Sequence, residues 1–81
     1  MFVNMEYVLT RAVAGGYAVG AFNIVNDLTA AAAIRAAEEL RSPIILQTSV
    51  STAKEIGAEH LISLLSDLAK RASVPVAVHL D

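Results

Sequence analysis

Val74–Asp81 reads VPVAVHLD, and this stretch decides the fold. The β-branched residues that follow Pro75 predict a buried strand. Because side chains alternate along a strand, His79 and Asp81 share one face at its carboxyl end. Apolar parallel strands that end in a carboxylate are typical of α/β enzymes, whose chemistry lies at the carboxyl ends of the strands. The stretch therefore predicts a parallel sheet with a site at one edge.

Two earlier segments have the same design, apolar along their length and polar at their ends. Tyr17–Asn23 reads YAVGAFN, and Ile44–Ser49 reads IILQTS. Gly20 in the first segment indicates a close approach by another backbone. A helical pattern precedes each of the three predicted strands. Alternation of helices with continuous apolar strands predicts a parallel sheet with right-handed crossovers.

The first predicted helix follows Asn4, a residue type that caps helix N-termini. Gly15-Gly16 ends it, because glycine adopts the left-handed conformation without steric cost. Its apolar residues at helical spacing, which predict the buried face, are Met5, Val8, Leu9, Ala12 and Val13.

The second predicted helix runs from Leu28 to about Leu40, and its alanine run predicts tight packing on a sheet. A third helical region starts at Ser51 or Thr52, and Thr52 has with Glu55 the spacing of a capping box. Gly57 is expected to separate this turn from the main helix. The apolar stripe of that helix comprises Leu61, Leu64, Leu65, Leu68, Ala69 and Ala72.

Composition excludes several classes of protein. The chain has 81 residues, enough for one small domain or a piece of a larger one, and a hydrophobic content of 56% argues against disorder. A net charge of −2 with scattered basic residues gives no surface for nucleic acid. No segment approaches the roughly 20 apolar residues of a membrane span. Without cysteine or a basic leader after Met1, we expect a cytoplasmic protein.

Parallel strands bring their carboxyl ends to one edge, where we expect a ligand site. The polar residues predicted at that edge are Asn23, Asn26, Gln47, Thr48, Ser49, His79 and Asp81. The alternative is that polar residues follow every strand because loops are polar. Asp81 has the chemistry of a general acid or base. Ser49 has no evident base beside it, so we expect its hydroxyl to bind substrate or phosphate.

His79 is interpreted as a hydrogen-bonded core residue, since a single histidine without a second ligand makes a poor metal site. His60 falls early in the last helix and is expected to face solvent. The glycines form neither a G-x-G-x-x-G loop nor a P-loop, which argues against dinucleotide and P-loop folds. A β/α-barrel is the remaining parallel-sheet candidate.

Three segments resemble the N-terminal part of the class II, metal-dependent ketose-bisphosphate aldolases, whose best-known member is fructose-bisphosphate aldolase. The matching segments are Gly16–Asn23, Ser42–Ser49 and Val74–Asp81. In that family the strand of the last segment ends in His-Leu-Asp-His-Gly, of which His79, Leu80 and Asp81 match the first three residues. The resemblance implies an α/β fold, in which an N-terminal helix precedes about three parallel strands of a TIM (β/α)8 barrel. It also implies a dimer or tetramer with a catalytic divalent metal, usually zinc.

Carried over by position, Asp81 matches the family's catalytic aspartate, which handles the proton of the substrate's C4 hydroxyl. Ser49 matches a serine near the phosphate of the dihydroxyacetone phosphate half. Asn23 matches an active-site asparagine on the first strand, so it and Ser49 are the expected substrate-binding residues. His79 matches the first histidine of the motif, which is not a metal ligand in the family.

In the family the metal-binding histidine directly follows the aspartate, and the other ligands and five more strands come later. The resemblance therefore implies that residues 1–81 are the N-terminal part of one barrel domain, with the Zn2+ ligands beyond Asp81. The parent would cleave fructose 1,6-bisphosphate reversibly to dihydroxyacetone phosphate and glyceraldehyde 3-phosphate, and residues 1–81 alone would be inactive. Two alternatives stay open: a tagatose-bisphosphate or related ketose-bisphosphate aldolase, and a non-catalytic half-barrel that pairs through its strand edges.

Overall fold

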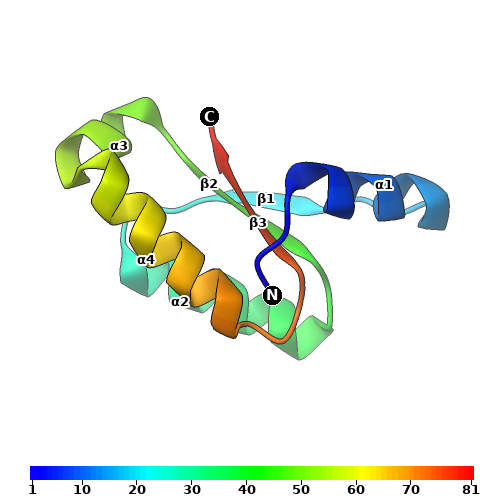
Figure 1. The fold of residues 1–81 in the computed structure, drawn as a ribbon. Helices are drawn as coiled ribbons and strands as arrows, with labels where there is room; N and C mark the ends of the chain where they lie inside the picture. Colours follow the sequence, from blue (N-terminus) through cyan, green and yellow to red (C-terminus); the bar gives the residue numbers. More distant parts are fainter.

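The computed structural model describes all residues, 1–81. Its helices pack on both faces of a parallel sheet (Figure 1). The strands are adjacent in chain order, β1-β2-β3, and every pair is parallel. The elements are α1 (Met5–Gly15), β1 (Gly20–Asn23), α2 (Asp27–Leu40), β2 (Ile44–Thr48), α3 (Val50–Ile56), α4 (Ala58–Arg71) and β3 (Val76–Leu80). The predicted alternation is confirmed, and Gly57, at a φ of 99°, separates α3 from α4 as expected.

The larger core lies between the sheet and the pair α2 and α4, which Figure 1 shows on the same side of the strands. Ala30 and Ala37 are buried on α2, so the small side chains bring this helix close to the sheet as predicted. From α4 the buried residues are Leu61, Leu65 and Ala69, three members of the predicted stripe. The sheet contributes Ile44, Leu46 and Val76.

A smaller core lies on the opposite face, where α1 packs (Figure 1). Val8 of α1 contacts Ile45 and Ala77, which are neighbours in the strand register. The predicted apolar face of α1 is partly wrong, because Leu9 and Val13 are 46% and 84% exposed. Helical spacing identified the residues, but the direction from which the sheet meets α1 decides which of them are buried.

The N-terminal segment extends the sheet beside the start of β3. Phe2 forms a parallel bridge with Val76, and the Val3 N–H donates to the Val76 carbonyl over 2.9 Å. The Val76 N–H in turn donates to the Met1 carbonyl over 2.8 Å. This pairing covers the beginning of the outer edge of β3.

Some predicted boundaries and contacts were wrong. The first strand begins at Gly20 rather than Tyr17, because the Tyr17 N–H bonds to Ala12 at the end of α1. The close neighbour of Gly20 is not another backbone but the Phe22 ring, which a Cβ at Gly20 would meet at 2.5 Å. At α3 the N-terminal cap is Ser49, rather than Ser51 or Thr52.

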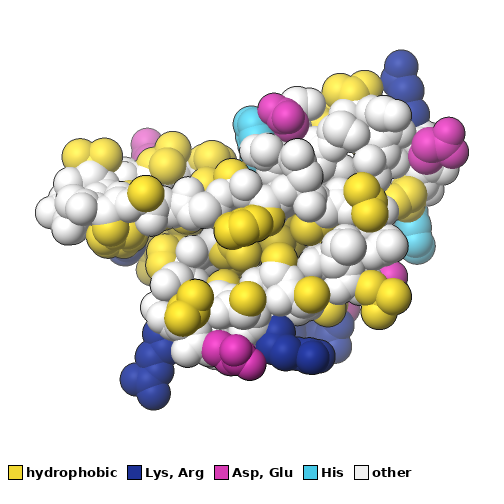
Figure 2. Space-filling view, turned by 180° about the vertical axis from the view of Figure 1, so that it is seen from behind, with side chains coloured by type: hydrophobic (Ala, Val, Ile, Leu, Met, Phe, Trp, Pro, Cys, Tyr) yellow, Lys and Arg dark blue, Asp and Glu magenta, His cyan; other side chains and the backbone are white.

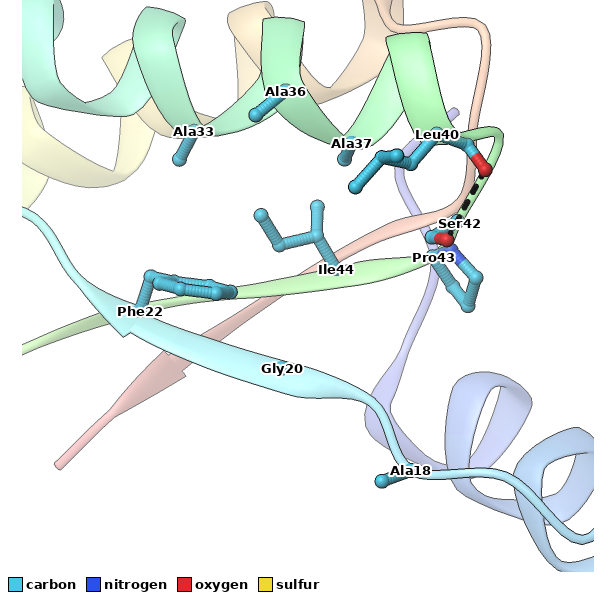
Figure 3. A pocket seen from close by; sticks show the side chains of 10 residues that line it. All are labelled: Ala18, Gly20, Phe22, Ala33, Ala36, Ala37, Leu40, Ser42, Pro43 and Ile44. Carbon is cyan, nitrogen blue, oxygen red and sulfur yellow. Dashed lines mark hydrogen bonds between the residues drawn. The ribbon is translucent and has the colours of Figure 1, made fainter.

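A groove of about 270 Å³ is open between α2 and the outer part of β1 (Figure 3). Phe22 and Ile44 lie on its sheet side, opposite Leu40 and the alanines of α2. Figure 2, seen from behind, shows hydrophobic side chains gathered in the middle of that view, with charged side chains toward its periphery. The full lining comprises Ala18, Gly20, Phe22, Ala33, Ala36, Ala37, Leu40, Ser42, Pro43 and Ile44.

Candidate functional site

One row of polar side chains crosses all three strands at their carboxyl ends. Asn23 is opposite Gln47, and Gln47 is opposite His79, so alternation places the three on one face. The Gln47 Nε2 group donates to Asn23 Oδ1 over 3.0 Å. The row below consists of Ala21, Ile45 and Ala77, and α1 packs over its last two members. The polar row therefore forms the open end of the face whose other end α1 covers.

Asp81 continues this face beyond β3. Its backbone N–H donates to the Thr48 carbonyl over 2.8 Å, which holds the residue beside the end of β2. Since Thr48 is paired with Leu80, one further step of the register places Asp81 next to Ser49. Asp81 is exposed, so its carboxylate is accessible at the strand edge. The structure thus brings together at one edge the three residues predicted as the site: Asn23, Ser49 and Asp81.

Ser49 has a second, structural role. Its hydroxyl oxygen accepts a hydrogen bond from the Thr52 N–H over 3.1 Å, and its Oγ–H donates to Thr52 Oγ1 over 3.1 Å. These bonds cap α3, which orients the first turn of that helix relative to the end of β2. The contact of Ser49 with a phosphate stays a prediction.

Two residues of the predicted polar edge do not belong to the site. Asn26 caps α2, accepting from the Thr29 N–H over 2.9 Å. Thr48 points to the opposite face from Gln47 and is only 2% exposed. Asn26 is therefore polar for a reason unrelated to a ligand site. Strand alternation excludes Thr48 from the site, because it places this side chain on the opposite face of the sheet.

The histidines do not form a metal site within these residues. His79 is exposed and has no side-chain hydrogen bond, so its interpretation as a hydrogen-bonded core residue is wrong for this chain. The polar row that contains it is not covered by any helix. His60 lies on α4 and is exposed, as expected. No group of three His, Cys, Asp or Glu side chains is close enough to hold a metal ion, so these residues alone do not fit a zinc site.

The sequence predicted that Gln47 lies at the polar edge of the sheet but predicted no role for it. Its link to Asn23 depends on the register between β1 and β2, which pairs residues 24 positions apart. The sequence contained one indication of this contact: Asn23 and Gln47 each follow a run of apolar residues in a predicted strand. Alternation then places Gln47, but not Thr48, on the face of Asn23.

Comparison with known proteins identifies the family. The profile of the family described as fructose-bisphosphate aldolase class-II matches residues 3–81. The chain belongs to the class II fructose-bisphosphate aldolase family. This confirms the resemblance inferred from the three sequence segments.

Two solved structures have closely similar folds. The chain is 30% identical to the YdjI aldolase of Escherichia coli K12, with a TM-score of 0.89 over 100% of this chain and 32% of that one. A Coccidioides immitis protein, assigned as a fructose-1,6-bisphosphate aldolase, is also 30% identical, with a TM-score of 0.86 over 95% and 29% of the two chains. The chain thus spans about 30% of the length of these aldolases and has the fold of the N-terminal part of their barrel.

No α-helix of the structure combines the length and the apolar character needed to cross a membrane.

Proposed function

We propose that residues 1–81 form the N-terminal part of a single aldolase barrel domain. The complete protein would reversibly cleave fructose 1,6-bisphosphate to dihydroxyacetone phosphate and glyceraldehyde 3-phosphate. The observation that carries this proposal is the shared edge of Asn23, Ser49 and Asp81, in a chain that matches the class II family over residues 3–81. A carboxylate beside hydrogen-bonding side chains suits the hydroxyl groups of a sugar substrate.

Asp81 is proposed as the catalytic residue. In the cleavage direction its carboxylate takes the proton of the C4 hydroxyl while the C3–C4 bond breaks. C4 becomes the carbonyl carbon of the aldehyde product, and the electron pair of the broken bond stays with C3, which then takes up a proton. In the synthetic direction Asp81 returns the proton to the C4 oxygen. The hydrogen bond from Asp81 N–H to the Thr48 carbonyl supports this role, because it fixes the backbone that carries the carboxylate.

Asn23 and Ser49 are proposed to bind the substrate, Asn23 through its amide and Ser49 through a hydroxyl contact to phosphate. Both are exposed at the same edge as Asp81. Ser49 lies at the junction of β2 and α3, where a bound group would contact both the strand end and the helix cap.

Zn2+ is proposed as the cofactor of the complete protein, bound by side chains outside residues 1–81. The two histidines of this chain lie on different elements, and within residues 1–81 no group of three His, Cys, Asp or Glu side chains could hold a metal ion. The proposal also includes a homo-oligomer, dimer or tetramer, as the assembly and the cytoplasm as the location. Membership of the family supports the assembly, and the lack of cysteine suits a reducing compartment.

The test is to assay the complete polypeptide that contains these residues with fructose 1,6-bisphosphate and with tagatose 1,6-bisphosphate. Release of dihydroxyacetone phosphate is measured by coupling it to NADH oxidation. We expect cleavage of fructose 1,6-bisphosphate with the higher kcat/KM, and none by the 81-residue chain alone. Faster cleavage of the tagatose compound would overturn the substrate assignment, and cleavage of neither would overturn the function.

A further inference from the structure

Gln47 connects two strands within the polar row. It lies on β2, the central strand, whose backbone is paired on both sides with β1 and β3. Asn23 lies on β1, which within residues 1–81 is paired with β2 alone. Gln47 is half-buried while Asn23 is exposed. Gln47 Nε2 donates a hydrogen bond to Asn23 Oδ1 over 3.0 Å. This bond therefore restrains the exposed side chain of Asn23 through the more buried side chain of Gln47.

The direction of this bond decides what Asn23 offers to a ligand. A side-chain amide has an acceptor oxygen and a donor NH2 group, and rotation about χ2 exchanges their places at little cost. Because Oδ1 accepts from Gln47, the NH2 group of Asn23 is directed away from Gln47 with both N–H donors free. Without Gln47, the amide of an exposed asparagine would present its oxygen or its NH2 group with similar ease.

We propose that Gln47 is a positioning residue, which fixes the Asn23 amide so that its NH2 group donates to an oxygen of the substrate. This inference rests on the proposed function, since it assigns the bound group as an oxygen-rich phosphorylated sugar. Gln47 acts through Asn23 and needs a side-chain donor. A carboxylate in its place would accept from the Asn23 NH2 group and turn the Asn23 oxygen toward the ligand.

The test is a double-mutant cycle in the complete protein. Gln47→Met keeps the length of the side chain and removes the donor, and Asn23→Ala removes the amide that Gln47 orients. Each substitution alone is expected to lower kcat/KM about tenfold, the effect of losing one oriented hydrogen bond. In the Asn23→Ala background, Gln47→Met should lower kcat/KM by no more than about twofold further. Effects that multiply would overturn the positioning role.

Gln47→Glu is the second variant, because it reverses the polarity of the contact. We expect it to lower kcat/KM at least as much as Gln47→Met does. Thr48→Val is the control, since Thr48 is the next residue, is buried and faces away from the polar row. It should leave kcat/KM unchanged. Equal activity of Gln47→Glu and the unsubstituted protein would also overturn the proposal.

A spectroscopic measurement separates this inference from the proposed activity. In the complete protein labelled with 15N at asparagine, the side-chain NH2 signal of Asn23 is assigned by its absence in Asn23→Ala. We expect Gln47→Met and Gln47→Glu to move this signal in different ways, while Thr48→Val leaves it in place. If the protein cleaves neither bisphosphate, the signal still reports the contact. If it cleaves them but the signal is the same in all variants, only the positioning role is overturned.

Discussion

Within residues 1–81, Asp81 makes its contact through the backbone rather than through its side chain. The backbone N–H makes the contact to Thr48, and the exposed carboxylate has no hydrogen-bond partner in the chain. Asp81→Asn is nearly isosteric, so the strand end should keep its geometry. The amide cannot accept and return a proton, and general acid–base groups typically contribute about 10²–10⁴-fold. In the complete protein we expect kcat to fall by that factor, with KM and metal content nearly unchanged.

The control for Asp81→Asn is Asp67→Asn. Asp67 is also an exposed aspartate, but it lies on α4 and pairs only with Arg71 of the same helix, at 3.0 Å. It should leave kcat unchanged, because surface ion pairs contribute little. Steady-state kinetics at saturating substrate separates the two, and a near-normal kcat for Asp81→Asn would show that the aspartate is not the proton carrier.

The side-chain hydroxyl of Thr48 has no hydrogen-bond partner. Its hydroxyl is buried beneath the helices without a hydrogen bond, and the residue is 2% exposed. Thr48→Val keeps the branched shape and removes the unpaired hydroxyl, whose burial costs about 1–3 kcal/mol. We expect Thr48→Val to stabilise the complete protein by about 1 kcal/mol, measured as a higher midpoint in urea. Thr48→Ser, which keeps the hydroxyl and removes the methyl group, should lower the midpoint, and a lower midpoint for Thr48→Val would contradict this reasoning.

At the scale of the elements, a carboxylate links α2 to the loop that leads into β3. Glu38 accepts from the Ser73 N–H over 2.8 Å and from the Ser73 hydroxyl over 3.1 Å. The backbone hydrogen bond from Ser73, followed by the bond from its side chain, lowers the pKa of Glu38. The stabilising contribution is therefore fully present above the glutamate pKa of the unfolded chain, about 4.3. It is lost as the pH falls through the lower pKa of the folded chain.

Glu38→Gln should remove this part of the acid sensitivity. The amide oxygen still accepts from Ser73, but it does not titrate, so the loss of stability between about pH 4.3 and more acidic values becomes shallower. Thermal melting of the complete protein over a pH series measures the effect. Glu39→Gln changes the neighbouring exposed carboxylate, which has no such contact, and should leave the slope as it was. Identical slopes for Glu38→Gln and the unsubstituted protein would show that the contact does not matter.

The elements that local pattern determines were predicted from the sequence, and those that depend on distant contacts were not. The cap at Asn4, the break at Gly57 and the apolar stripe of α4 were predicted correctly. Each depends on residues that are close together in the sequence. The buried side of α1 depends on where the sheet lies. At the candidate site, the shared edge of Asn23, Ser49 and Asp81 followed from parallel strands alone.

The remaining features of the site needed the register or the tertiary environment. The bond from Gln47 to Asn23 joins residues that meet only when β1 and β2 are aligned. His79 is exposed because no element within residues 1–81 packs over the polar row, and no local pattern encodes this. The helix α3 is capped by Ser49, whereas Ser51 or Thr52 was predicted to start it. All three carry a hydroxyl that can cap a helix, so the local sequence did not decide between them.

Residues 1–81, taken as a whole, leave much apolar surface open. Only 16 of 81 residues are buried, and Phe22 and Leu40 beside the groove are 55% and 76% exposed. The outer edge of β1 is unpaired, and that of β3 is paired only at its start by the N-terminal segment. Open strand edges next to apolar surface favour association with other chains.

We therefore expect the isolated 81-residue chain to self-associate or to be partly molten. Sedimentation velocity should show species larger than the 8.5 kDa monomer, and melting should be broad. Leu40→Lys places a charge at the groove and should reduce the association, because a charged rim opposes apolar contact. Val13→Lys is the matched control, since Val13 is 84% exposed on α1 and does not line the groove. A monodisperse monomer with a sharp cooperative transition would contradict the prediction. Equal association of both variants would mean that the contact lies elsewhere than the groove between α2 and β1.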